Sequence, residues 1–422
     1  MVHLYPFQAV HPKKEKAQDV AAVPYDVVDA KEAAEIIRKQ PHSFLTISRS
    51  DATLSCDPHD AKVYRAAQER FAQYMRDGLL IKDQVPSLYI YRVTAHIKSY
   101  TGLCGCFDLF EYQDGTIRKH ELTRVEKEQD RTRHIDAVNA NTGPVIFLHE
   151  RNQIIRSLLA ERIQMIKTPS ICVTAPDGSV HEIFPFYEDE QIQPFVEEFS
   201  KIRHLYIADG HHRCKSALNV LEQRAAHADA SALPEETKRV MGVAFAEDEV
   251  IVYGYHRLIL ALHHTTPEAF MAMLKEIATV TPYPSLDPSV CQIKTIQDAT
   301  TFHILHLYYD KTWYEVAIPK KSVQNPVDAL DVTVLQTHIL EPFLHITDPR
   351  TDPTLQYVGG SSPVSVLMEA VDRGEAVFAI AMQPVSVTDV FAIADSGGIM
   401  PPKSTWFEPK MLSGLTTHLL SS

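Results

Sequence analysis

The sequence predicts a mixed α/β (α+β) fold whose C-terminal tail packs back onto the body. Short runs rich in β-branched and aromatic residues, which are typical of strands, alternate with segments of helical character along most of the chain. One such strand, 205–208, passes through a polar turn directly into a helical stretch near Lys215. Trp406 and Phe407 lie in the tail, and a tail that only frayed would not usually hold two large aromatic side chains.

The length and composition are those of a globular protein. The 422 residues are enough for two domains or one large one. We expect a first domain over 1–235 and a C-terminal α/β region over 236–422, which is either separate or completes the same body. The hydrophobic fraction of 45% and the charged fraction of 23% are ordinary for a soluble protein.

The net charge and the first residues of the sequence argue against several classes of protein. A net charge of −13 argues against broad nucleic-acid binding, which depends on clustered Lys and Arg. No stretch approaches the ~20 apolar residues of a membrane helix, and the first residues lack the basic segment and apolar core of a signal peptide. The six cysteines are scattered, and only Cys104 and Cys106 lie close together. We therefore expect a cytoplasmic protein with free thiols and without membrane or nucleic-acid partners.

The N-terminal half carries the clearest signals for individual elements. A capping box, with Thr123 as N-cap and Glu126 reaching back, predicts a helix from 124 to about 140 that stops near Gly143. The pair Asp177-Gly178 predicts the turn of a hairpin. In chain order we expect helices over 31–39 and 61–76, strands over 87–94 and 99–112, the helix over 124–140, a strand over 145–148, a helix over 153–166, hairpin strands over 170–174 and 179–185, the strand 205–208 and a helix over 215–224.

The C-terminal half continues the alternation. Strands are predicted over 240–246, 250–255, 301–307 and 312–318, and helices over 267–279, 329–340 and 364–372. The segment 400–410 is rich in proline, aromatic and basic residues, so it cannot form a regular helix or a central strand.

The turn Asp209-Gly210-His211-His212-Arg213 is the densest group of reactive side chains in the chain. A helix start carries unpaired N–H groups and partial positive charge, which makes it an anion site. Arg213 offers a planar fork for phosphate or carboxylate, and the histidines can donate to an anion, move protons or bind metal. Asp209 can hold Mg²⁺, orient a histidine or act as a base. The alternative is that Asp209 only caps the helix and the histidines are exposed loop residues.

A second group lies on the predicted helix 124–140. Glu126, Asp130 and His134 recur every four residues and share one face, with Arg131 beside them. This face can hold a divalent metal at Asp130, or place a general base beside a substrate-binding arginine. The alternative is a solvated helix face with ordinary i,i+4 pairing.

Three further segments are candidates. Tyr25 and Asp26 follow Pro24, and Asp26 is either a base, a metal ligand or a turn cap. Lys403, Ser404 and Thr405 can donate to a phosphate or carboxylate, or are ordinary tail residues. A weaker candidate is the pair His256-Arg257 at a strand end.

Four motifs in this order resemble the bacterial family "domain of unknown function 1015". They are Ala21-Ala22-Val23-Pro24-Tyr25-Asp26, His120-Glu121-Leu122-Thr123 with Asp130-Arg131, Ile207-Ala208-Asp209-Gly210-His211-His212-Arg213, and Met400-Pro401-Pro402-Lys403-Ser404-Thr405. Members of that family are often likened to the ParB/sulfiredoxin superfamily, which includes the ParB CTP switch and free-serine kinases. The resemblance implies a ParB/sulfiredoxin-like core that sets the 209–213 turn against nucleotide phosphates.

The chain departs from two branches of that superfamily. Sulfiredoxin has a cysteine where this sequence has His211, while Cys214 lies beyond the arginine, so a sulfiredoxin-type reductase is not expected. ParB proteins carry a DNA-binding helix-turn-helix, which this acidic sequence does not show. The free-serine kinases remain the closest chemical parallel.

The resulting hypothesis is a nucleotide-dependent, Mg²⁺-assisted phosphotransferase that acts on a small hydroxylated metabolite such as serine. Its nucleotide is ATP or ADP, with CTP as a third option, and its oligomeric state is open, a homodimer included. The alternatives are a non-enzymatic, ParB-type nucleotide-binding module and a metal-dependent hydrolase built on the histidines. The expected roles are catalytic for Asp209, His211, Glu121 and Asp26, nucleotide-binding for Gly210, His211, His212, Arg213, Arg131, Lys403, Ser404 and Thr405, and metal-binding for Asp130 and Asp209.

Overall fold

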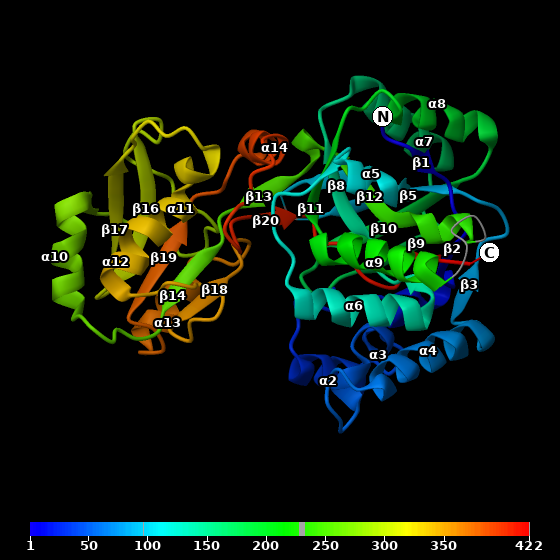
Figure 1. The fold of residues 1–422 in the computed structure, drawn as a ribbon, viewed down its shortest axis with the longest axis horizontal. Helices are drawn as coiled ribbons and strands as arrows, with labels where there is room; N and C mark the ends of the chain where they lie inside the picture. The colour runs from blue at the N-terminus through cyan, green and yellow to red at the C-terminus, as the bar shows by residue number, and fades with distance from the viewer. Residues whose placement is uncertain (96, 228–232, 422) are drawn as a thin grey trace. The chain divides into compact units, whose positions relative to one another are not determined.

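The computed structural model describes residues 1–95, 97–227 and 233–421. The chain divides into two compact units: the first holds Met1–Val250 and Pro409–Ser422, and the second holds Ile251–Glu408. In sequence, the second unit is therefore an insertion into the first. Both are drawn in Figure 1, and each is described below by itself. The mixed α/β class expected from the sequence is confirmed.

The first unit is built around a nine-stranded mixed sheet. Its neighbours β8 and β12 run parallel, as do β6 and β11, while the other pairs are antiparallel. The strands in spatial order are β6 (Ile117–Arg118), β11 (Leu205–Asp209), β8 (Val145–His149), β12 (Arg239–Ala246), β5 (Ser99–Asp108), β4 (Leu88–Thr94), β10 (Val180–Phe186) and β9 (Ile171–Thr174), with β1 (Leu4–Tyr5) paired to β5.

Helices cover this sheet and build a further layer beyond it. Figure 1 shows α6 lying between α9 and the group α2 to α4, and α6 contacts both α9 and α4. The helices are α1 (Ala17–Val20), α2 (Ala30–Lys39), α3 (Leu45–Ser48), α4 (Ala61–Arg76), α5 (Leu109–Asp114), α6 (Val125–Val138), α7 (Gln153–Ile166), α8 (Asp189–Phe199) and α9 (His211–His227).

Apolar spacing explains how α9 is held. Cys214, Leu218 and Leu221 recur at i, i+4 and i+7, and they enter the same core as Phe147 of β8. This packing fixes the first turn of α9 next to the ends of β11 and β8, where the candidate site lies.

The start of α6 differs from the predicted capping box. The helix begins at Val125, its N-cap is Arg124, and no side chain caps it. The Thr123 hydroxyl donates instead to the carboxylate of Glu128, two residues further along than Glu126. The helix still ends close to the predicted position, because Asn139 adopts a left-handed conformation with φ of 56°.

The last residues return to the first unit and complete a small sheet. In it β21 (Thr417–Leu419) lies between β2 (Ala9–Pro12) and β7 (Ala140–Asn141), and β3 (Leu80–Lys82) pairs with β2. The prediction that the tail packs back onto the body is therefore confirmed.

The second unit has a six-stranded sheet of its own. Its strands in spatial order are β15 (Thr279–Pro282), β17 (Thr312–Pro319), β16 (Phe302–Tyr309), β19 (Phe378–Met382), β14 (His256–Ile259) and β18 (Leu355–Val358), with a separate pair of β13 (Ile251–Tyr253) and β20 (Trp406–Glu408). The helices are α10 (Pro267–Ile277), α11 (Asp331–Leu335), α12 (Glu341–Leu344), α13 (Ser365–Asp372) and α14 (Val387–Asp395). Within the segment 400–410, residues 400–405 have no regular structure, and Trp406–Glu408 form β20, which belongs to a two-stranded pair and is not a central strand, as the proline content predicted.

The division differs from the boundary expected between residues 235 and 236. A domain that stopped at residue 235 would lose β12, which lies between β8 and β5 in the large sheet, so the first unit extends to Val250. Within the described ranges, no helix combines the length and the apolar character needed to cross a membrane.

Candidate functional site

The 209–213 turn is tighter than the sequence suggested, because α9 starts at His211 and not near Lys215. Gly210 makes this possible: its φ is +92°, and a Cβ there would lie 3.3 Å from the Cα of Val145. The two histidines and Arg213 therefore form the first turn of the helix, at the positive end of its dipole.

Asp209 is held in place by two partners at the end of β11. Its carboxylate accepts the N–H of Gly210 at 2.8 Å and a bond from Lys410 Nζ at 2.9 Å. Burial would raise the pKa of Asp209, but the charges of Lys410 and Arg213 outweigh burial and lower that pKa. Asp209 is thus a firmly ionised group that positions the turn. Lys410, which the sequence reasoning missed, reaches it from more than two hundred residues along the chain.

The histidines of this region are mostly buried and neutral. His211 is 6% exposed, and its ring packs edge-on against His120 at 4.7 Å between centroids. Burial lowers the pKa of His120 to about 4 and that of His211 well below its ordinary value. His212 accepts the N–H of Arg124 at 3.0 Å, and burial lowers its pKa as well. The alternative of exposed loop histidines is therefore wrong for His211.

Two arginines converge on the ring of Tyr25. The guanidinium carbon of Arg131, on α6, lies 4.2 Å from the ring centroid, and that of Arg213, on α9, lies 5.4 Å away. Both arginines are 9% exposed. Arg213 donates from Nη1 to the carbonyl of Pro144 at 2.8 Å, while its buried Nε has no hydrogen-bond partner.

The loop that carries Tyr25 is fixed by a third arginine. Arg49 donates to the carbonyls of Tyr25 at 3.2 Å and Val28 at 2.5 Å, which holds the loop against the body. The next residue, Asp26, has a side chain that is 42% exposed and lies 3.4 Å from Nη2 of Arg213. Asp26 is thus a loose counter-ion that a ligand can replace.

A small cavity of about 20 Å³ lies beneath these groups. The side chains of Tyr25, Arg131, His134 and Arg213 line it together with Gly143; the remaining lining residues are Ser48, Ile135, Asn141, Thr142 and Ser413. A space of this size holds one water-sized group. The polar lining can therefore receive one oxygen atom of an anion.

Asp130 positions Arg131. Its Oδ2 accepts from Nη2 of Arg131 at 2.6 Å and from Nε at 2.9 Å, and its Oδ1 accepts from the Tyr64 hydroxyl at 3.0 Å. Burial would raise the pKa of Asp130, but Arg131 and Tyr64 lower it. On the same helix, His134 bonds the carbonyl of Ile47 at 3.0 Å, and burial lowers its pKa to about 4.

The expected metal ligands do not come together. Among the described residues, three potential ligands cluster within 4.8 Å only at Cys106, Glu236 and His418, none of which was predicted. Asp130 and Asp209 each face a cation instead. Glu121 is partly exposed in the segment before α6, and Glu126 is exposed on the surface of α6.

The remaining predicted residues belong to the second unit. Lys403 has a φ of +57°, and its ammonium lies 5.1 Å from the ring centroid of Tyr255. Ser404 is buried and donates to the carbonyl of Pro401 at 2.6 Å, while Thr405 is partly exposed. Arg257 donates to the carbonyl of Lys403 at 3.0 Å and so shapes this turn.

Comparison with known families identifies the chain. The family described as "Protein of unknown function (DUF1015)" matches residues 4–333. The chain belongs to this family. The DUF1015 match includes Tyr25, Asp130, Arg131 and the 209–213 turn, and it ends before Lys403. The family predicted from the sequence motifs is thus confirmed, while the wider relation to ParB and sulfiredoxin stays a prediction.

Several solved structures resemble this DUF1015 protein distantly. A free serine kinase in complex with AMP has 12% identity and a TM-score of 0.36, covering 74% of this chain and 90% of that one. A mutant free serine kinase with ADP has 11% identity and a TM-score of 0.36, with 74% and 91% covered. A conserved hypothetical protein from Pyrococcus furiosus has 13% identity and a TM-score of 0.33, with 72% and 89% covered. At these values the likeness assigns no activity. No curated protein matches the chain.

Proposed function

We propose that the first unit of this DUF1015 protein binds the phosphates of a nucleotide at Arg131, Arg213 and the start of α9. We further propose that it transfers a phosphoryl group to a small hydroxylated metabolite such as serine. The observation that carries the proposal is the pair of buried arginines on the Tyr25 ring, one of which has a buried Nε without a partner.

Physical chemistry supports an anion at this position. A buried guanidinium is costly unless its charge and its donors are satisfied. Arg213 has one carbonyl acceptor, a buried Nε without a partner, and a long ion-pair contact to the half-exposed Asp26. The positive charges of Arg131 and Arg213 lie beside the same tyrosine ring, which also favours an anion that binds to both. The first turn of α9 adds N–H groups and its dipole to the same place. A phosphate would satisfy all of these groups at once.

The same groups suffice for phosphoryl transfer, which consists largely of positioning and neutralising charge. Arg131 and Arg213 would bind the phosphate oxygens and stabilise the charge that develops on them. Asp26 is the exposed carboxylate beside Arg213, so it would accept the proton of the attacking hydroxyl. Asp209, held ionised by Lys410, keeps Gly210 and the helix start in register. The catalytic role of Glu121 and the nucleotide-binding roles of Lys403, Ser404 and Thr405 stay predictions from the sequence.

The residues of the site fit Mg²⁺ only as a complex with the nucleotide, in which the phosphates supply most of the ligands. Mg²⁺ is usually held by one or two carboxylates together with substrate phosphates. Asp26 offers one exposed carboxylate, whereas Asp130 and Asp209 are engaged by Arg131 and Lys410. When bound, the ion would neutralise phosphate charge. The proposed cosubstrate is ATP or ADP, with CTP as the alternative.

Calorimetric titration of ATP, ADP and CTP, with and without Mg²⁺, tests the phosphate site. Arg213→Ala should weaken binding by roughly tenfold to a hundredfold, because hydrogen bonds to charged groups are lost. Arg224→Ala is the matched control: Arg224 lies on the same helix and pairs with Asp136 of α6 at 2.9 Å, away from the cavity. Arg213→Lys, checked by circular dichroism, keeps the test valid if the alanine variant misfolds.

Two outcomes would change the assignment. If no nucleotide binds, or if Arg213→Ala and Arg213→Lys both bind like wild type, the phosphate site is wrong. If a nucleotide binds but no phosphorylated serine or other hydroxylated acceptor forms, the protein is a binding module and the transferase assignment is wrong.

A further inference from the structure

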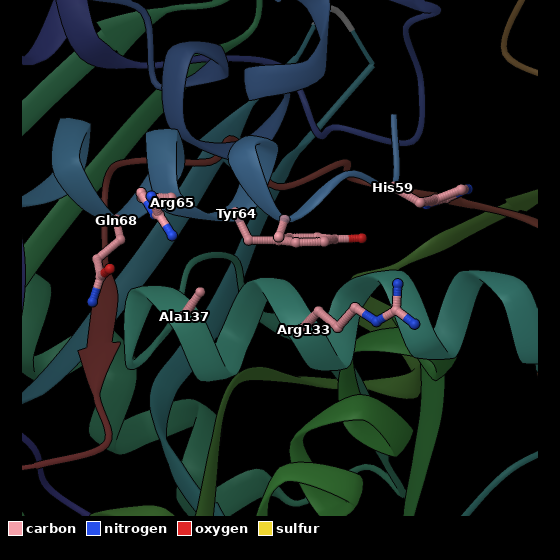
Figure 2. Close-up of a pocket in the computed structure, with 7 residues that line it drawn as sticks. His59, Tyr64, Arg65, Gln68, Arg133 and Ala137 are labelled. Carbon is pink, nitrogen blue, oxygen red and sulfur yellow. The ribbon is translucent and has the colours of Figure 1, made fainter. Parts of the chain in front are cut away.

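We propose that the pocket between α4 and α6 binds a small organic anion, as a site separate from the Arg131–Arg213 pair. The pocket has a volume of about 400 Å³. Figure 2 shows the ring of Tyr64 lying between the two helices, with Arg133 rising from α6 beside it and His59 beyond it. Arg65 and Gln68 extend from α4 on the other side of the ring.

The floor of this pocket is apolar. Tyr64 is 6% exposed, so its ring forms a fixed surface, and Ala61 and Ala137 leave open space beside it because they have small side chains. A volume of this order is typical of small-molecule sites. The pocket can therefore hold the apolar body of a small metabolite against an aromatic ring.

The rim of the pocket is positively charged. Arg65 and Arg133 line it, and neither forms an ion pair with a carboxylate of the described residues. By contrast, Arg131 on the same helix as Arg133 is paired with Asp130. Asp130, whose carboxylate lies 3.5 Å from Nδ1 of the lining residue His59, is already engaged by Arg131 and Tyr64.

These observations define the ligand class. Two guanidinium groups without carboxylate partners among the described residues, together with the imidazole of His59, favour oxygen anions, and the amide of Gln68 adds a neutral donor and acceptor. The floor favours an attached ring or short apolar chain. A carboxylate and a phosphate monoester share this chemistry, and the experiment below separates them.

Asp130 connects this pocket to the site described above. Its Oδ1 lies 3.0 Å from the Tyr64 hydroxyl and 3.5 Å from His59 Nδ1, whereas its Oδ2 holds Arg131. An anion in the pocket would compete with Asp130 for the hydrogen bond from the Tyr64 hydroxyl. Without that bond, the Asp130 carboxylate would interact more strongly with Arg131. Arg131 would then bind a phosphate less well, so occupancy of the pocket should oppose nucleotide binding. This coupling rests on the proposed function; the pocket itself does not.

Calorimetry on the full chain without nucleotide tests the pocket. Benzoate and phenyl phosphate carry the same ring with different anionic heads, and benzyl alcohol is the neutral control. We expect one or both anions to bind and the alcohol not to bind. The exposed pair Arg65→Met and Arg133→Met together should weaken that binding at least tenfold, whereas Arg70→Met, on α4 beside Gln73, should not change it.

The result that would overturn the proposal is binding of neither anion, or equal binding by wild type and the Arg65→Met/Arg133→Met variant. The ratio of the affinities for benzoate and phenyl phosphate shows whether the pocket prefers a carboxylate or a phosphate. Loss of anion binding in Arg213→Ala but not in the double variant would place the anion at the other site and would also overturn the proposal.

A second titration tests the coupling. Saturating phenyl phosphate should weaken ATP binding about fivefold, at the low end of measured coupling energies. Tyr64→Phe keeps the ring but removes the hydroxyl, so the anion should still bind while its effect on ATP disappears. An unchanged ATP affinity in wild type would overturn the coupling alone. Failure of ATP to bind at all would defeat the proposed function and leave the result for the pocket standing.

Discussion

Arg213 of the first unit and Arg257 of the inserted unit share a local arrangement but differ in what surrounds them. Both are buried, both stack on a tyrosine ring, and both donate to a backbone carbonyl. Arg257 donates through both Nη atoms, to Tyr255 and Lys403, and no carboxylate of the described residues pairs with it. Arg213 donates to one carbonyl, keeps a buried Nε without a partner and faces the exposed Asp26.

The pKa values follow this difference. Burial lowers the pKa of Arg257 to about 10, because only tyrosines oppose it. Burial also acts on Arg213, but Asp26, Tyr25 and Asp209 together outweigh it and raise the pKa of that guanidinium. A buried arginine whose two Nη atoms both donate to backbone carbonyls is a structural clamp, whereas one with a buried unused donor and a replaceable counter-ion is suited to a ligand.

The largest expected effect is a loss of stability that distinguishes the structural role of Arg257 from the ligand-binding role of Arg213. Arg257→Ala should lower the free energy of unfolding of the second unit by about 3 kcal/mol, because two carbonyls lose their donor and a cavity remains. Both tryptophans, Trp313 and Trp406, lie in this unit, so tryptophan fluorescence during urea unfolding reports it. Arg213→Ala should leave that transition in place and reduce nucleotide affinity. Equal stability losses in both variants would remove the distinction.

Lowering the pH provides a second comparison of the two units, because each unit contains a buried histidine. Burial lowers the pKa of both His134 and His256 to about 4, so the unfolded chain binds more protons than the folded one between pH 6.5 and 4. Each histidine therefore costs stability as the pH falls through this window, up to about 3 kcal/mol.

Replacing either histidine with glutamine, whose amide does not titrate, shows which unit loses stability at low pH. His134→Gln should reduce the loss measured by circular dichroism without moving the tryptophan transition, and His256→Gln should reduce it in the tryptophan signal. Urea unfolding at several pH values provides the measurement. An unchanged pH dependence in both variants would show that neither histidine is kept neutral.

The smallest expected effect concerns the partner of Asp209. Lys410→Met should cost about 1–2 kcal/mol at pH 7, because a partly buried carboxylate loses its ammonium. The lowered pKa of Asp209 gives stability that is present above the ordinary aspartate value and is lost as the pH falls below it. The variant should therefore show a smaller stability loss below pH about 4 than wild type. A full-sized acid loss in Lys410→Met would show that other carboxylates cause it.

Local signals predicted local structure well. The helix expected over 61–76 matches α4, since its apolar residues recur at helical spacing and Gly78 follows it. The sequence could not predict that α9 begins at His211, because that start depends on the φ of Gly210 and on its close approach to Val145. α8 was missed because Pro194 lies inside it.

Long-range contacts limited the prediction of the site. Tyr25, Asp26, Arg131 and Arg213 were all candidates, and the structure brings them together. Nothing in the local pattern indicated that Lys410 would pair with Asp209 or that Arg49 would hold the Tyr25 loop, because both contacts join distant segments. Asp130 was predicted as a metal ligand, and that role stays a prediction; the contact that the sequence did not indicate is its support of Arg131, whose guanidinium donates to its carboxylate.

The interrupted first unit has a consequence for synthesis on the ribosome. β21, the strand between β2 and β7, is translated after the entire second unit. Until then the edges of β2 and β7 lack the strand that joins them, and Asp209 lacks Lys410. The inserted unit is complete earlier and can fold first, because domains fold largely as independent units during translation. The arginine pair on Tyr25 therefore gains its finished surroundings only when the segment that follows the second unit, with Lys410 and Ser413, has been translated.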